Sequence, residues 1–174
     1  MISYLAKMVF FHFMGWRIEG EFPELKKLII AVYPHTRKMD FIVGVLTRAV
    51  LNKKISFMGK HELFNPLSGW FFRALGGIPI NRNSNENKVS SIVQIFKGKD
   101  TFRMAISPEG TRKKVDQWKT GFYYIALKAN VPILLVHLNY TSKKVSFLKL
   151  FTPNGEIDEN LKEIKANFYK AEQV

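Results

Sequence analysis

His35 and Asp40 are the first pair of side chains in the sequence that could do chemistry. Four residues separate them, and an apolar run precedes them. A carboxylate bonded to one imidazole nitrogen fixes the tautomer and orientation of the ring, and leaves the other nitrogen free to take a proton. The pair therefore suggests a general base. Taken alone, it has another interpretation, in which Asp40 caps the following helix and His35 is a loop residue.

A metal site is not indicated by the sequence around this pair. There is no H-E-x-x-H pattern and no nearby carboxylate cluster. The chain has no cysteine, which removes disulfides, zinc–thiolate sites and cysteine nucleophiles. His12, His61 and His137 have no acidic partner at short spacing, so we expect structural or surface roles for them.

A second candidate is Arg82, at the end of the segment 71–82. Gly76 and Gly77 permit a tight reversal, and a short apolar stretch then leads to Arg82. The guanidinium fork can bind two oxygens of a phosphate at once. The alternative is a surface arginine after an ordinary turn.

The third candidate is the segment 106–112, whose sequence is I-S-P-E-G-T-R. Its acid, hydroxyl and cation, followed by two lysines, suit an anionic substrate held partly by backbone N–H groups. Ser107 is not part of a G-x-S-x-G elbow, so we do not expect it to be a nucleophile. A solvated loop is the alternative.

The elements that must position these residues alternate along the chain. Apolar periodicity and Gly or Pro breaks predict strands at 16–21, 27–33, 55–59, 78–80, 103–107, 132–140 and 144–151, and helices at 40–51, 66–75, 88–96, 120–129 and 157–169. Alternation of this kind predicts one α/β domain over residues 1–174, a mixed, largely parallel sheet flanked by helices on both faces. Sites in such sheets gather beyond the carboxyl ends of the strands, where His35 and residues 108–112 fall.

Residues 1–16 form a short, mostly apolar and aromatic segment. It is too short to span a bilayer, which needs about 20 apolar residues. One interpretation is a helix packed on its own domain, and the other is an interfacial membrane anchor.

The chain is strongly basic, with 27 Lys and Arg against 14 Asp and Glu and a net charge of +13. Such a surface attracts nucleic acid, anionic lipid headgroups or phosphorylated small molecules. No recognised nucleic-acid motif accompanies the charge, which argues against nucleic acid.

Together the three segments resemble the glycerolipid acyltransferase family, which includes lysophosphatidic-acid acyltransferases. The H-x4-D motif matches His35 and Asp40, F-x-R-x-x-G-x-[IF]-x-I-x-R matches residues 71–82, and [FI]-x-E-G-T-R matches Ile106 with the run at 109–112. A fourth motif, an apolar strand that begins with V-P, matches residues 131–136. The four motifs occur in the family's order.

This resemblance implies an O-acyltransferase of phospholipid synthesis without cofactor or acyl-enzyme. His35 and Asp40 would be catalytic, and the substrate-binding residues would be Lys60, Arg82, Glu109, Gly110, Thr111 and Arg112. The donor would be acyl-CoA or acyl-carrier protein, and the acceptor a lysophospholipid, foremost 1-acylglycerol-3-phosphate. Glu109 would organise the site rather than bind an anion directly. The protein would sit at the cytoplasmic face of a membrane, peripherally or monotopically, on an anionic surface.

Two other functions fit the sequence. One is an O-acyltransferase for a lyso-aminoacyl lipid of the ornithine or glycine type. The other is a non-enzymatic basic module that binds a membrane or nucleic acid, which would not need the His35 and Asp40 pair. The sequence does not distinguish the acceptor, the acyl chain length, the donor or the oligomeric state.

Overall fold

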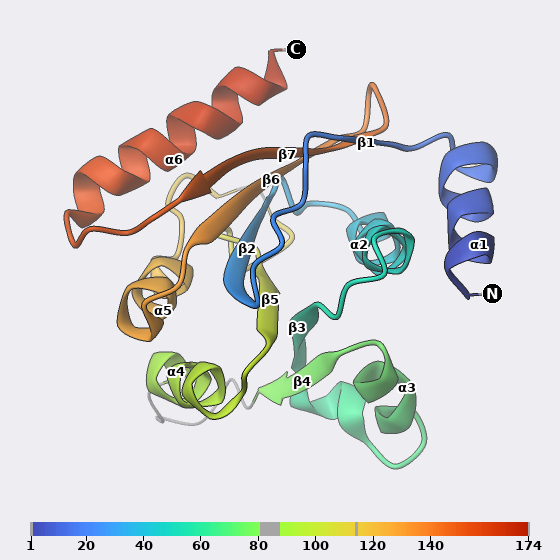
Figure 1. Cartoon of the computed structure of the whole chain (residues 1–174), viewed down its shortest axis with the longest axis horizontal. Coiled ribbons are helices and arrows are strands. Elements are labelled where there is room, and N and C mark those ends of the chain that lie inside the picture. Colours follow the sequence, from blue (N-terminus) through green and yellow to red (C-terminus); the bar gives the residue numbers. More distant parts are fainter. Residues whose placement is uncertain (1, 81–87, 114, 174) are drawn as a thin grey trace.

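A seven-stranded sheet runs through the computed structural model, which describes residues 2–80, 88–113 and 115–173 (Figure 1). The order of strands across the sheet is β1-β7-β6-β2-β5-β3-β4. Among the strand pairs of the described residues, only β6–β7 is antiparallel. The strands are β1 (Arg17–Glu19), β2 (Lys27–Tyr33), β3 (Ser56–Lys60), β4 (Gly77–Ile80), β5 (Phe102–Ile106), β6 (Ile133–Asn139) and β7 (Lys144–Phe151). The expectation of a mixed, largely parallel sheet is confirmed.

Helices cover both faces of this sheet, as the sequence predicted. In Figure 1, α4, α5 and α6 lie on one side of the sheet, while α1 and α2 lie on the other and α3 lies beside the β3–β4 edge. The helices are α1 (Ile2–Lys7), the π-helix η1 (Met8–Phe13), α2 (Met39–Val50), the 3-10 helix η2 (His61–Phe64), α3 (Gly69–Ala74), α4 (Lys88–Gly98), α5 (Gly121–Ala129) and α6 (Ile157–Glu172).

Two hydrophobic cores lie on the two faces, and β2 contributes to both. Ile29 and Ala31 face the core under α4, α5 and α6, whereas Leu28 and Ile30 face the core under α1 and α2. Successive side chains of a strand point to opposite faces, so a strand buried on both sides reads as a continuous apolar run. The run in β2 is therefore explained by its central place in the sheet.

The N-terminal segment has two different faces. Phe10 is fully buried and Trp16 is 4% exposed, and both pack into the second core. On the outward side, Tyr4 and Phe13 are each 77% exposed. The inward side matches the interpretation of a helix packed on its own domain, and the outward side leaves an apolar surface uncovered. Within the described residues, no helix has the length and apolar character needed to cross a bilayer.

The largest departure from the predicted elements is at 66–75, where a helix was expected throughout. Residues 66–68 form a turn, and α3 begins only at Gly69. The Asn65 carboxamide oxygen accepts hydrogen bonds from the backbone N–H groups of Leu67 and Ser68, both at 2.9 Å. Such side-chain bonds offer the backbone an alternative to the helix. Two helices also end later than predicted: α4 continues to Gly98 and α6 to Glu172.

Candidate active site

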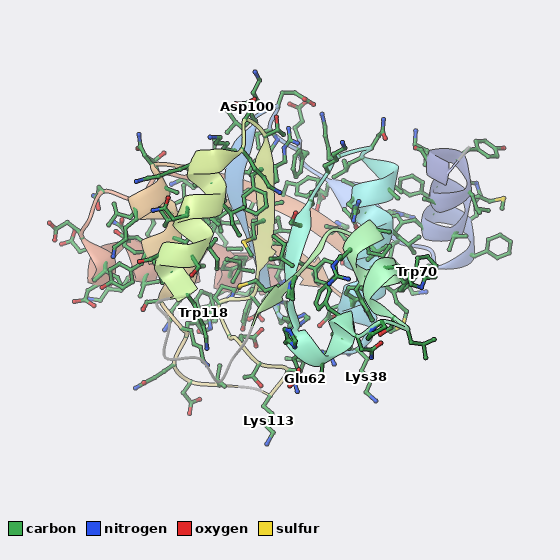
Figure 2. The ribbon with its side chains drawn as sticks, turned by 90° about the horizontal axis from the view of Figure 1, so that it is seen from below. Lys38, Glu62, Trp70, Asp100, Lys113 and Trp118 are labelled. Atoms are coloured by element: carbon green, nitrogen blue, oxygen red, sulfur yellow. The ribbon has the colours of Figure 1, made fainter. Side chains whose placement is uncertain are left out.

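Three neighbouring strands bring the candidate residues together. β2 lies between β5 and β6 and is parallel to both, so their carboxyl ends meet at one edge of the sheet. His35 follows β2, Ser107 follows β5 and Tyr140 follows β6. Figure 2 shows Lys38 and Lys113, from the loops after β2 and β5, at one end of the molecule and Asp100 at the opposite end.

His35 and Asp40 form the expected pair. Nδ1 of His35 lies 3.1 Å from Oδ2 of Asp40, and the Asp40 side chain is 1% exposed, against 28% for His35. This contact places the N–H of the ring on Nδ1. Among the described residues, Nε2 of His35 has no hydrogen-bond partner, so this nitrogen is available to accept a proton.

Asp40 also shapes the turn between the two residues. Its Oδ2 accepts the backbone N–H of Arg37 at 2.8 Å, and its Oδ1 accepts the hydroxyl of Tyr140. One carboxylate therefore orients the histidine and also closes the turn before α2. It does not cap the helix in the usual sense: Lys38 is the N-cap residue and makes no side-chain cap bond.

The donors around Asp40 keep it ionised. Burial would raise its pKa, but the hydrogen bonds from His35, Tyr140 and the Arg37 N–H outweigh burial and hold the pKa below its ordinary value. The first turn of α2 adds the positive end of the helix dipole. A carboxylate that stays charged stabilises the imidazolium that forms when His35 takes a proton.

Glu109 holds the same loop from the neighbouring strand. Its side chain is buried, and its Oε2 accepts the backbone N–H of His35 at 2.5 Å. Burial raises the pKa of Glu109, although hydrogen bonds from His35 and Ser107 oppose that shift. Glu109 therefore has the organising contact expected from the sequence, and its carboxylate does not point outward toward an anion.

The rest of the E-G-T-R segment turns sharply and ends in exposed cations. Gly110 has φ +64°, and a Cβ on it would lie 2.7 Å from Cδ of Lys119. Only glycine adopts that backbone without strain. The Thr111 hydroxyl accepts the Lys113 N–H at 3.3 Å, and Arg112 is exposed. Within the described part of the chain, Arg112 makes no ion pair, so its guanidinium is free to meet an anion.

The two remaining substrate-binding candidates come from the β3–β4 edge of the sheet. Lys60 is exposed at the carboxyl end of β3, and His35 lies beyond the carboxyl end of β2, on the same side of the sheet. Arg82 lies outside the described residues. Its motif does contain a turn that requires glycine: Gly76 has φ +84°, and a Cβ there would lie 2.6 Å from the carbonyl oxygen of Ile55.

A cavity of about 380 Å³ lies beside the Glu109 loop. Its described lining combines carboxylates with aromatic rings: Tyr33, Glu109, Val115, Asp116, Trp118, Tyr169 and Glu172. Among the residues that the structure describes, no group of three or more His, Cys, Asp or Glu side chains could hold a metal ion.

Tyr140 is the site residue that sequence reasoning missed. It stands 100 positions from Asp40, in no recognised motif, and its hydroxyl reaches the carboxylate because β6 is the neighbour of β2. The other histidines are as expected, with His12 and His61 exposed and His137 buried in β6.

The chain is similar in sequence to known acyltransferases. The acyltransferase family model matches residues 16–138. The 1-acyl-sn-glycerol-3-phosphate acyltransferase of Salmonella typhimurium is 28% identical over 151 residues, which cover 83% of this chain and 60% of the relative. The enzyme of the same name from Streptococcus pneumoniae is 30% identical over 131 residues, which cover 70% of this chain and 48% of the relative.

The fold is also that of a solved structure. The crystal structure of the 1-acyl-sn-glycerophosphate acyltransferase PlsC from Thermotoga maritima matches with a TM-score of 0.71 at 23% identity, covering 99% of this chain and 77% of the other. The chain spans about three fifths of the length of the Salmonella relative. Since the family model covers most of the chain, including His35, Asp40 and the E-G-T-R segment, the protein belongs to the glycerolipid acyltransferase family.

Proposed function

We propose that the protein transfers a fatty acyl group from a thioester, acyl-CoA or acyl-carrier protein, to the free hydroxyl of 1-acylglycerol-3-phosphate. The observation that carries the proposal is the 3.1 Å contact between His35 Nδ1 and buried Asp40, which leaves Nε2 open. Relatives along most of this chain are named 1-acyl-sn-glycerol-3-phosphate acyltransferases, which supports the same acceptor.

The chemistry follows from that free nitrogen. Nε2 of His35 takes the proton of the acceptor hydroxyl as its oxygen attacks the thioester carbonyl. The C–O bond forms, the C–S bond breaks, and the imidazolium returns its proton to the leaving thiolate. Asp40 stabilises the imidazolium while it lasts. A positioned base of this kind contributes about 10² to 10⁴ in rate.

Exposed cations on the same edge suit the phosphate of the acceptor. Arg112 and Lys60 are exposed at the carboxyl ends of the strands, the edge of the sheet where His35 and Asp40 lie. Arg82 follows β4 in the sequence. An arginine fork binds two phosphate oxygens at once. We propose that these residues hold the headgroup while the acceptor hydroxyl faces His35.

The test is radiolabelled acyl transfer by purified protein with mixed-micelle acceptor. His35→Ala should reduce kcat by at least about a hundredfold at unchanged melting temperature. His61→Ala is the matched control, since His61 is exposed near the same edge but has no carboxylate partner among the described residues. Retention of more than a tenth of wild-type activity in His35→Ala would contradict the proposed base.

A second acceptor class is favoured by one observation, the cavity beside Glu109. Carboxylates and aromatic rings, as in this lining, suit an ammonium group better than a phosphate. A lyso-aminoacyl lipid of the ornithine or glycine type would place its amine there. Equal assays with lyso-ornithine lipid and 1-acylglycerol-3-phosphate decide between the two, and Asp116→Asn should weaken only the amine-bearing acceptor.

We also propose that the protein attaches to the cytoplasmic face of an anionic membrane through its exposed apolar side. Tyr4 and Phe13 are 77% exposed, and Leu67 and Trp70, around the start of α3, are 88% and 69% exposed. Figure 1 places α1, α2 and α3 toward the same side of the molecule. The net charge of +13 supports attraction to anionic lipid.

Vesicle sedimentation tests the attachment with point substitutions, because deleting residues 1–16 would also remove the buried Phe10 and Trp16. Phe13→Ser should lower binding to anionic vesicles about tenfold, the loss expected when one aromatic side chain no longer enters the interface. Tyr124→Ser is the control, since Tyr124 is exposed on α5 on the other face. Equal binding by the two variants would contradict the attachment.

A further inference from the structure

Both carboxylate oxygens of Asp40 accept hydrogen bonds, and His35 contacts only one of these oxygens. His35 Nδ1 and the Arg37 N–H both contact Oδ2, at 3.1 and 2.8 Å. The other oxygen, Oδ1, accepts the hydroxyl of Tyr140. No other hydrogen bond to Oδ1 occurs within the described residues, so Tyr140 alone fixes that half of the carboxylate.

The ring of Tyr140 is itself fixed by its neighbours. Trp16 packs against it at right angles, with ring centroids 5.0 Å apart. The guanidinium of Arg37 lies 4.2 Å from its ring centroid. Both contacts are of favourable kinds, an edge-to-face aromatic pair and a cation over a ring. The tyrosine hydroxyl is therefore presented to Asp40 from a rigid position at the end of β6.

We propose that Tyr140 is a positioning residue for catalysis, which pins the Asp40 carboxylate so that Oδ2 stays aligned with Nδ1 of His35. The inference rests on the proposed function. The terminal torsion of an aspartate is broad, so a carboxylate bonded through one oxygen can rotate. A second donor on the other oxygen removes that freedom.

The hydroxyl can play this role at neutral pH. Burial raises the pKa of Tyr140, and the hydrogen bond and charge of Asp40 raise it further. Tyr140 therefore remains protonated and remains a donor at neutral pH. It does not compete with His35 for the proton of the acceptor.

The first test is Tyr140→Phe, which keeps the ring between Trp16 and Arg37 and removes only the hydroxyl. It should lower kcat about tenfold and leave the KM of both substrates unchanged, because the hydroxyl acts through Asp40. Tyr123→Phe is the matched control: its buried hydroxyl bonds Asn160 at 2.9 Å, in the core under α6. That variant should lose stability but not kcat.

A second arm repeats Tyr140→Phe in the Asp40→Ala background, where the hydroxyl has no carboxylate to hold. The two losses should then fail to multiply, so the double variant matches Asp40→Ala within about twofold. A further tenfold loss in that background would overturn the proposal. So would a Tyr140→Phe enzyme that keeps more than half of kcat, or one that loses only acceptor KM.

A third arm needs no turnover, and so separates failure of this inference from failure of the proposed function. The proton between His35 Nδ1 and Asp40 should give a downfield ¹H resonance that is absent in His35→Ala. Tyr140→Phe should shift or broaden that resonance, and Tyr123→Phe should leave it in place. An unchanged resonance in Tyr140→Phe would overturn the positioning role, whatever the acceptor proves to be.

Discussion

The loops after β2 and β5 lie side by side at one edge of the sheet and use their carboxylates in opposite ways. Directly after the β2 loop, in the first turn of α2, Asp40 is surrounded by donors, and its pKa is lowered in spite of burial. In the β5 loop, Glu109 is buried with fewer donors, and its pKa is raised. One carboxylate faces the imidazole of His35, and the other faces the backbone of the same residue.

The two carboxylates therefore have two different tasks at His35: one supports the charge of its ring, and the other holds its backbone in place. Asp40 keeps a full negative charge beside Nδ1 of His35, which suits support of an imidazolium. Glu109 binds the backbone N–H, which fixes where the residue stands. The exposed Arg112 belongs to the β5 loop. We therefore expect substitutions in the β2 loop to affect the chemical step and those in the β5 loop to affect placement and acceptor binding.

The largest effect should come from Asp40→Asn. The amide can offer its N–H to the imidazole, which favours the wrong tautomer, and it carries no charge to stabilise the imidazolium. We expect kcat to fall by at least about a hundredfold while both KM values change little. Steady-state kinetics with saturating acceptor check this. Near-normal kcat would reduce Asp40 to a residue that closes the turn.

Glu109 should matter for its acceptor oxygen more than for its charge. Glu109→Ala leaves the half-buried His35 backbone N–H without the carboxylate that it contacts, so we expect a loss of about tenfold to a hundredfold in kcat/KM. Glu109→Gln keeps an oxygen at the same place and should lose only a few-fold. If the two variants are equally impaired, the charge of Glu109 acts directly and the comparison of the two loops is wrong.

Arg112→Gln should have a smaller and more selective effect. Losing a charged hydrogen bond to a phosphate should lower kcat/KM for the acceptor about tenfold, with the KM of the thioester unchanged. Lys54→Gln removes the same charge at the opposite edge, before β3 begins, and serves as the control. Equal losses in both variants would indicate a general effect of net charge.

The smallest effects should appear in the pH dependence of stability, with opposite signs. The lowered pKa of Asp40 gives stability that is present above its ordinary value of 3.8 and is lost as the pH falls through the lowered value. The raised pKa of Glu109 means that ionised Glu109 destabilises the fold above that raised pKa. Glu109→Gln should therefore have a higher melting temperature than the wild type at pH 7, and the gain should vanish near pH 4. A constant gain at all pH values would contradict the assignment.

Much of the fold could be predicted from the sequence, because its signals are local. The run in β2 and the period of α6 identified their elements, and β7 was predicted with its correct bounds. Where local side-chain bonds intervene, the prediction failed, as at Asn65, whose carboxamide holds residues 66–68 in a turn. A prediction from helix propensity does not include hydrogen bonds between a side chain and the nearby backbone.

The site was predictable only as far as its parts are near in sequence or carried by a motif. His35 and Asp40 share one turn, and the motif pointed to Glu109 without showing which atoms it contacts. Tyr140 had no signal, because its contact with Asp40 depends on β6 lying next to β2. The order of parallel strands follows from how the whole sheet packs, and residue spacing does not encode it.

The central place of β2 also has a consequence for how the chain is made. This strand leaves the ribosome before its neighbours in the sheet, β5 and β6, which are synthesised much later. Until then its apolar residues have no strand to pair with, and such long-range pairing is slow and exposes the nascent chain to aggregation. The His35 loop is therefore completed only when Tyr140 has left the exit tunnel, and pausing of translation before that point should leave a nascent chain that binds chaperones and is sensitive to protease.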